Sequence, residues 1–366
     1  MKYARMAIEV ESPEEYGYDL IRNNLSESSI RDRTIADFGL TIPNLTLLYG
    51  EHRGDKRLRE LVAAQGSGLS ADDVLVTTGA AGALFIISTT LLRPADHLVV
   101  IRPNYATNIE TPRAIGCQIS LIDLKFEDGF AINLDAVRQA IQANTRLVSV
   151  TCPHNPTGTM LTREQLDGLV SLTGDLGIHL LVDETYRDLS YDVQLPISSS
   201  LADHVISVSS LSKAYGIPGV RTGWLITKDP ELYVKFLAAK EQINICGSIV
   251  DEWISGAVLE QRDDFLALLR VEMRKRLSIV RDWVASEPMI DWIEPSGGVV
   301  CFPKIVADAA FDTKAFYARL LEKHGTYVGP GHWFEMPTNF FRIGYLWPTQ
   351  DELHAGLEGI SKALRD

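Results

Sequence analysis

The sequence IHLLVDETY, residues 178–186, indicates the fold class. A short, mostly apolar run passes directly into charged and polar residues without any alternation. Continuous apolar runs of this length are typical of strands that are buried on both faces of a parallel sheet. Similar runs occur at residues 74–77, 97–101, 147–151, 205–208 and 224–227. Because helical patterns separate them, the sequence predicts an α/β fold with a mostly parallel sheet between helices.

The length of 366 residues predicts two domains, because a single hydrophobic core stops growing below that size. After residue 235 the alternation of strands and helices gives way to long helical patterns, and a smaller mixed region ends the chain. We therefore expect a large domain at residues 45–250. A smaller α+β domain would combine residues 1–44, the N-terminal arm, with residues 251–366.

Composition limits the functional classes. The 35 Lys and Arg residues against 48 Asp and Glu residues give a net charge of −13, which disfavours nucleic acid or an anionic membrane as a partner. No apolar stretch is long enough to span a bilayer and no signal-peptide pattern is present, so we expect a cytoplasmic protein. The cysteines are Cys117, Cys152, Cys246 and Cys301. Their scattered spacing disfavours a metal site or a disulfide framework.

Polar segments follow the predicted strands directly. They are TGAAG at 78–82, PNY at 103–105, CPHNPTG at 152–158, DETY at 183–186 and SSLSK at 209–213. In open parallel sheets, ligands bind in the crevice at the carboxyl ends of the strands. We therefore expect these five segments to form one site.

Lys213 and Asp183 point to pyridoxal 5′-phosphate (PLP) as a cofactor of this site. A lysine that forms a Schiff base must be partly desolvated, and the hydroxyls of Ser210 and Ser212 with Arg221 nearby suit a phosphate. A carboxylate ~4 Å from the pyridine nitrogen contributes roughly 4 kcal/mol, or about 3 pKa units, which keeps that nitrogen protonated. The structural alternatives are a solvated lysine and a helix-capping or ion-paired aspartate.

The turn at residues 79–82 predicts a seat for the phosphate. Gly79, Ala80 and Ala81 would offer free amides at the start of a helix, and Arg221 would add a charged clamp. The alternative is that the glycines of this turn serve only to allow tight packing of the strand against the helix. Tyr105 is a candidate to stack on the pyridine ring, although a tyrosine at such a position is more often part of the core.

Asn155 and Tyr186 offer an amide and a phenol at neighbouring strand ends, where both could donate to the phenolate oxygen of PLP. Good turn chemistry is the alternative for Asn155. Arg342 lies in the apolar run FFRIGY at 340–345, and a charge in such a run needs a partner. A substrate carboxylate bound by both guanidinium arms would be such a partner. The alternative is that Arg342 lies on an edge strand in solvent, where it would need no partner.

Taken in order, these motifs resemble those of the fold-type I, class I/II PLP-dependent aminotransferases. The resemblance also includes Tyr49-x4-Gly54-x3-Leu58-Arg59 near the start of the predicted large domain and covers nearly the whole chain. It implies the PLP-dependent transferase fold, with a mostly parallel seven-stranded sheet, and a homodimer. In that dimer Tyr49 would reach the neighbouring subunit's phosphate, and Ser248 would lie near the interface.

The resemblance also implies a role for each site residue. Lys213 would be both the Schiff-base lysine and the catalytic base, and Asp183 would pair with the pyridine nitrogen. Asn155 and Tyr186 would bind the phenolate oxygen, and Arg342 would bind the substrate carboxylate. The phosphate would be held by Ser210, Ser212, Arg221 and the amides of Ala80 and Ala81.

Two departures concern the substrate side. Residues 24–29 lack the usual Gly-x-Pro element and are more similar to the arm of capreomycidine synthase-like members, and Asn108 replaces a frequent second aromatic residue. The candidates for a side-chain pocket are Arg31, Arg33, His332 and Trp333. Each of these would serve equally well as a surface or packing residue, and His154 is explained as a turn residue.

The leading hypothesis is a ping-pong aminotransferase that acts on an amino acid and a 2-oxo acid. A PLP-dependent lyase, decarboxylase or cyclase on the same scaffold is the second hypothesis, because the same electron sink serves each reaction. A third is the effector-binding domain of a transcription regulator. It is disfavoured because the roughly 45 residues before Tyr49 contain no basic helix-turn-helix pattern.

Overall fold

A seven-stranded sheet forms the centre of the computed structural model, which describes residues 1–308 and 311–366. The strands are β2 (Val74–Thr78), β3 (His97–Arg102), β4 (Gln118–Asp123), β5 (Thr145–Thr151), β6 (His179–Asp183), β7 (Val205–Ser210) and β8 (Thr222–Ile226). Their order is β2-β8-β7-β6-β5-β3-β4, and only β8 runs against its neighbours. The predicted α/β fold with a mostly parallel sheet is confirmed.

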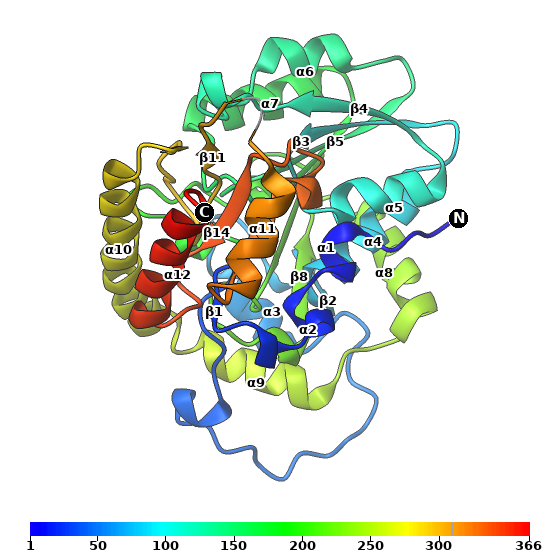
Figure 1. Ribbon diagram of the computed structural model, residues 1–366. Helices are drawn as coiled ribbons and strands as arrows, with labels where there is room; N and C mark the ends of the chain where they lie inside the picture. Colours follow the sequence, from blue (N-terminus) through cyan, green and yellow to red (C-terminus); the bar gives the residue numbers. More distant parts are fainter. Residues whose placement is uncertain (309–310) are drawn as a thin grey trace.

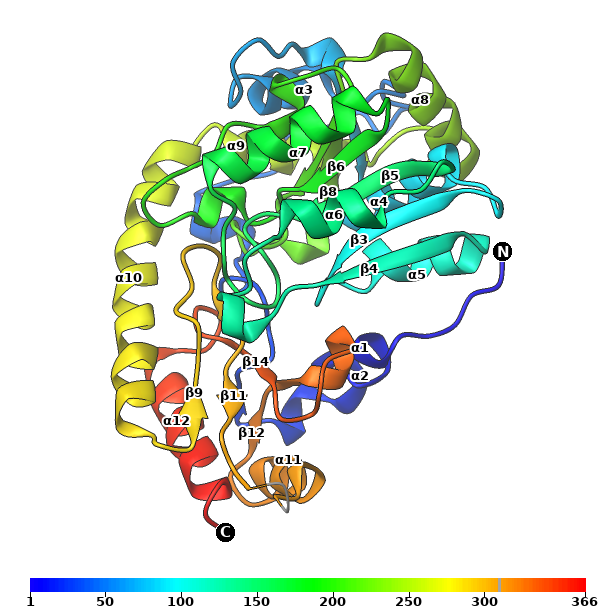
Figure 2. The same cartoon turned by 90° about the horizontal axis from the view of Figure 1, so that it is seen from above.

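Helices cover both faces of this sheet because side chains alternate between the faces along each strand. In β3, Leu98 and Val100 pack with α4, α5 and α8, whereas Val99 and Ile101 pack with α6 and α7 on the other face. Figure 2 shows α6 and α7 on one side of the strands and α4 on the other. The bounds are α4 (Gly79–Leu91), α5 (Thr107–Ile115), α6 (Leu134–Ala140), α7 (Arg163–Asp175) and α8 (Pro230–Asn244).

Beyond residue 260, the described residues form three α-helices and most strands of three small sheets (Figure 1). The helices are α10 (Arg262–Ser286), α11 (Thr313–Glu322) and α12 (Gln350–Ala363). The strands are β9 (Ile290–Asp291), β10 (Val300–Cys301), β11 (Lys304–Ile305), β12 (Thr326–Tyr327), β13 (Gly329–Pro330) and β14 (Phe341–Gly344). The N-terminal arm is built into this region, since β1 (Asn23–Asn24) pairs in parallel with β12. The domain boundaries at residues 45 and 250 stay a prediction.

A long extended segment, residues 41–54, leads from the arm to α3 (Lys56–Ala63), which packs against α9 (Ile249–Leu259). Figure 1 shows it as a wide loop below the sheet. Three consecutive large side chains on it, Leu47, Leu48 and Tyr49, are exposed, and Tyr49 is 80% exposed. Across residues 1–308 and 311–366, every helix is too short or too polar to cross a bilayer.

Candidate active site

A cavity of about 480 Å³ lies at the carboxyl ends of β5, β6 and β7, beside the N-terminus of α4. The strand topology explains its position, because parallel strands direct all their carboxyl ends to the same edge. The predicted residues that line it are Ala80, Ala81, Tyr105, Asn155, Asp183, Tyr186, Ser210, Ser212, Lys213, Arg221 and Arg342. The five polar segments expected from the sequence therefore meet at one place.

Asp183 is the last residue of β6 and is 4% exposed. Its Oδ1 accepts hydrogen bonds from the hydroxyl of Thr185 at 2.6 Å and from the Thr185 amide at 3.1 Å. Burial raises the pKa of the Asp183 carboxyl, whereas the bonds from Thr185 and Asn108 oppose that rise. A buried carboxyl of this kind suits a cationic ligand, because a nearby positive charge favours its ionised form and offsets its desolvation.

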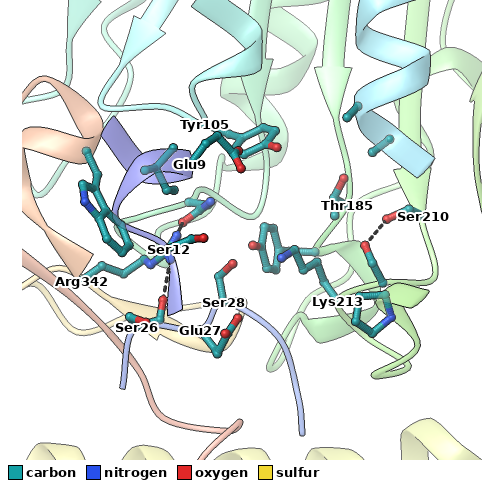
Figure 3. A pocket seen from close by; sticks show the side chains of 18 of the residues that line it. Glu9, Ser12, Ser26, Glu27, Ser28, Tyr105, Thr185, Ser210, Lys213 and Arg342 are labelled. Atoms are coloured by element: carbon teal, nitrogen blue, oxygen red, sulfur yellow. Dashed lines mark hydrogen bonds between the residues drawn. The ribbon is translucent and has the colours of Figure 1, made fainter. Parts of the chain in front are cut away.

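Lys213 projects into the same cavity from the turn after β7, as Figure 3 shows. Burial lowers the pKa of its amine, and the carboxylate of Glu27 is the strongest opposing influence. Arg342 lowers this pKa further through charge repulsion. The amine therefore loses its proton at a lower pH than the amine of an exposed lysine does. The neutral amine is the form that attacks an aldehyde.

Hydroxyls, amides and a guanidinium meet at the N-terminal end of α4. The hydroxyls of Ser210 and Ser212 lie 2.8 Å apart, and the dashed line in Figure 3 marks this bond. Gly79 has φ +68°, and a Cβ there would lie 2.8 Å from Nη2 of Arg221. Only glycine therefore lets the arginine approach the start of the helix so closely. Such a group of donors at a helix N-terminus suits a phosphate.

Arg342, at 4% exposure, is buried and is not an edge-strand residue in solvent. Its Nη1 donates to Oδ1 of Asn155 at 3.0 Å, and its Nη2 donates to the carbonyl of Ser26 at 2.5 Å. The guanidinium also lies 5.1 Å from the ring centre of Phe334, while Nε has no partner within the described residues. Tyr186 is buried nearby, and burial raises its pKa to about 12, so its hydroxyl stays protonated at neutral pH.

One wall of the cavity was not predicted from the sequence. Short helices α1 (Ala7–Val10) and α2 (Pro13–Tyr16) and the segment 26–28 line it, and they contribute Glu9, Glu14 and Glu27. These segments show neither strong periodicity nor a recognisable motif. Only the unusual number of acidic residues in the first 27 positions could have drawn attention to them.

Several candidates lie outside the cavity. Four residues were candidates for a substrate side-chain pocket, and of these only Trp333 lines the cavity. Arg31 pairs with Glu352, the ring of His332 bonds to Glu11, and the Arg33 guanidinium lies over Phe265. Tyr49 is far out on its loop, and Ser248 caps α9. His154 is buried and bonds to Thr157 and to the Pro103 carbonyl, which agrees with a structural role.

Asn108 is buried and does not line the cavity, and its amide donates to Oδ1 of Asn104 at 3.2 Å. Over the described parts of the chain, no group of three or more His, Cys, Asp or Glu side chains is arranged to hold a metal ion.

Comparison with known proteins identifies the family. The family model for aminotransferase class I and II matches residues 32–360, and the chain belongs to that family. Capreomycidine synthase from Streptomyces vinaceus is 32% identical, with 95% of this chain and 91% of that protein covered. Arginine–pyruvate transaminase AruH from Pseudomonas aeruginosa is 29% identical, with 78% and 74% covered.

Solved structures agree with this assignment. A PLP-dependent aminotransferase from Streptococcus suis has a TM-score of 0.92 at 27% identity and covers 100% of this chain and 98% of its own. The PLP-dependent cyclase OrfR has a TM-score of 0.89 at 26% identity with the same coverage. The chain is therefore a PLP-dependent enzyme with the PLP-dependent transferase fold.

The cavity fits this cofactor. The buried carboxyl of Asp183 suits a protonated pyridine nitrogen, and the desolvated amine of Lys213 suits an aldehyde. The donors at the start of α4, including Arg221, suit a phosphate. Charge and hydrogen-bonding capacity thus match the three polar regions of PLP.

Proposed function

We propose that the chain is an aminotransferase that moves an amino group between an amino acid and a 2-oxo acid by a ping-pong mechanism. One observation carries the proposal: a single cavity is lined by a desolvated amine, a buried carboxyl and a buried guanidinium, on Lys213, Asp183 and Arg342. These are the groups needed to hold the cofactor, to keep its nitrogen charged and to orient an amino acid.

Each residue has a role in holding the cofactor. Lys213 Nζ would hold the cofactor at its aldehyde carbon by condensation with loss of water, and Asp183 would keep a proton on its pyridine nitrogen. Ser210, Ser212 and Arg221 bind its phosphate together with the amides of Ala80 and Ala81. Because Oδ1 of Asn155 accepts from Arg342, the Asn155 amide nitrogen is left to donate to the phenolate oxygen, as does the Tyr186 hydroxyl. Tyr105 stacks on the ring.

The substrate is held by Arg342 and deprotonated by Lys213. When bound, PLP supplies an electron sink for the charge that develops at the substrate Cα. Arg342 binds the α-carboxylate and fixes the direction of the Cα–H bond. The amine of Lys213 would take the proton from Cα, and its lowered pKa increases the fraction of the amine that is neutral and able to do so.

A cyclase on the same scaffold is the second candidate, favoured by the similarity to capreomycidine synthase and to the cyclase OrfR. Incubation of PLP-loaded protein with an amino acid alone separates the two. An aminotransferase releases about one equivalent of 2-oxo acid per active site and resumes when a second 2-oxo acid is added. Continuous turnover without oxo acid would contradict transamination and support the second candidate.

We also propose that the chain forms a homodimer and that it is located in the cytoplasm. We further propose that residues 45–250 of each chain form the large domain. The exposed Leu47, Leu48 and Tyr49 support the dimer, because a cluster of large apolar side chains on one loop is unfavourable in water. A second hollow beside Arg221, lined by Ser248, offers Tyr49 of the partner subunit a route to the phosphate.

A further inference from the structure

The charges that line the cavity are unbalanced on the side of the N-terminal arm. Glu9, Glu14, Glu15 and Glu27 all face it there, and Arg5 is the only cation that the arm adds. Arg5 lies 3.5 Å from Glu15. Among residues 1–308 and 311–366, the other three carboxylates form no ion pair.

Glu27 is the most confined of these carboxylates. Its Oε1 accepts only two long hydrogen bonds, from Tyr18 and Asn24, each at 3.4 Å. Burial raises the pKa of Glu27, Glu14 raises it further, and the charges of Lys213 and Arg342 oppose this rise. The ionised form of Glu27 therefore depends on cations inside the cavity.

Substrate binding, as proposed above, removes the positive charges that favour the ionised form of Glu27. Arg342 is 4% exposed and its Nε has no partner within the described residues, which fits an anchor for the α-carboxylate of a ligand. Once that carboxylate is bound, the charge of Arg342 is neutralised, and the amine of Lys213 works as a neutral base. The carboxylate of Glu27 then gains from a new positive partner, and a cationic side chain of the ligand can supply one.

The arm that carries these carboxylates is fixed against the C-terminal third. Between α1 and α2, Glu11 accepts hydrogen bonds from Trp333 Nε1 at 2.7 Å and bonds to the ring of His332 at 2.7 Å. The Tyr327 hydroxyl donates to the backbone carbonyl of Glu11 at 2.6 Å. In Figure 3, Glu9 and Glu27 enter the pocket from two different segments of the arm.

We propose that the arm forms a side-chain subsite for a cationic amino acid, one that ends in a guanidinium or an ammonium group, with Glu27, Glu14 and Glu9 as its specificity residues. The inference rests on the proposed binding of an amino acid at Arg342. It also predicts discrimination against acidic side chains, because three carboxylates repel them.

The test compares L-arginine with L-citrulline, which has nearly the same shape but a neutral end. Binding to the PLP-loaded Lys213→Ala protein is measured by calorimetry, since turnover stops there, and kcat/KM is measured with the wild type. We expect arginine to be preferred by about tenfold or more in both measurements, which corresponds to at least ~1.4 kcal/mol. L-Lysine should resemble arginine, and L-glutamate should bind most weakly.

Variants identify the residues responsible. Glu27→Gln and Glu14→Gln should reduce the preference for arginine over citrulline to about threefold or less. Asp19→Asn is the matched control, because Asp19 is an exposed arm residue outside the cavity lining, and it should keep the full preference. Equal use of arginine and citrulline by the wild type, or an unchanged preference in both glutamate variants, would overturn the subsite. Failure of every amino acid to bind or react would instead overturn the proposed function, and this inference with it.

Discussion

Arg342 Nη1 donates a hydrogen bond across 3.0 Å to Oδ1 of Asn155, and both side chains are buried. The bond joins β14 of the C-terminal third to the loop that follows β5 in the central sheet. The proposed anchor of the substrate carboxylate and a proposed cofactor ligand therefore orient each other. A change in one of them should disturb both substrate and cofactor.

Replacement of Arg342 by lysine should lower kcat/KM by about 100-fold, or ~2.7 kcal/mol. A single ammonium cannot hold Asn155, the Ser26 carbonyl and a substrate carboxylate in one plane. Steady-state kinetics with a saturating 2-oxo acid would measure the loss. Arg31→Lys is the control, because Arg31 pairs with Glu352 outside the cavity lining, and its kinetics should stay close to those of the wild type.

Lys213→Ala should still bind PLP through the phosphate donors but should form no covalent adduct after borohydride reduction. Mass spectrometry of the reduced protein would measure this, and ultrafiltration would measure the bound cofactor. Reduction should add the mass of the cofactor to the wild type. An adduct of equal yield in the variant would show that another amine holds the cofactor.

Asp183→Asn should lower kcat/KM by about 1,000-fold, because an ion pair of roughly 4 kcal/mol is lost while the shape is retained. Thr185→Val should cause a smaller loss and should shift the pH titration of the cofactor's absorbance, since the Thr185 hydroxyl bonds to Asp183 at 2.6 Å. Thr185→Ser keeps that hydroxyl and should restore the titration. A cofactor spectrum unaffected by Asp183→Asn would contradict the proposed pairing.

His154 should make stability depend on pH. Burial lowers its pKa to about 4, whereas an unfolded histidine titrates near about 6.5. Between these values the unfolded chain binds the proton and the folded protein does not, so stability falls as the pH falls, by roughly 3 kcal/mol at most. Urea unfolding across this window should show a shallower dependence for His154→Gln. Parallel curves for the two proteins would exclude His154 as the cause.

Leu48→Asp should convert the proposed dimer into a monomer, because it places a charge among the exposed apolar side chains of residues 47–49. Sedimentation velocity would report the change. Leu268→Asp makes the same substitution at an exposed position on α10 and should leave the dimer intact. A monomeric wild type at micromolar concentration would contradict the dimer.

Much of the fold could be predicted from the sequence because the inner strands are continuous apolar runs that need no distant information. Strand β4, with the sequence QISLID, was not among the predicted runs. It lies at the edge of the sheet and is partly exposed, so it lacks the continuous apolar run by which the inner strands were predicted. Its place follows from pairing with β3, which is a tertiary property.

The part of the site that lies at strand ends could also be predicted from the sequence, since topology alone brings Asp183, Asn155 and Lys213 to one edge of the sheet. The wall formed by Glu9, Glu14 and Glu27 could not be predicted from the sequence. These residues reach the cavity because Glu11 and the pairing of β1 with β12 fix the arm against the C-terminal third, and no local pattern encodes those contacts. The position of Tyr49 relative to any second subunit likewise depends on a partner surface.

The pairing of β1 with β12 has a consequence for synthesis of the chain. Asn23 and Thr326 are 303 residues apart, yet Asn23 Nδ2 donates to the Thr326 hydroxyl at 3.1 Å. A segment made early must therefore wait for one made about 300 residues later before it can dock. The central sheet can form while translation continues. The arm's wall of the pocket can therefore be completed only after residue 326 has emerged, so the proposed selectivity would be gained later than the sheet.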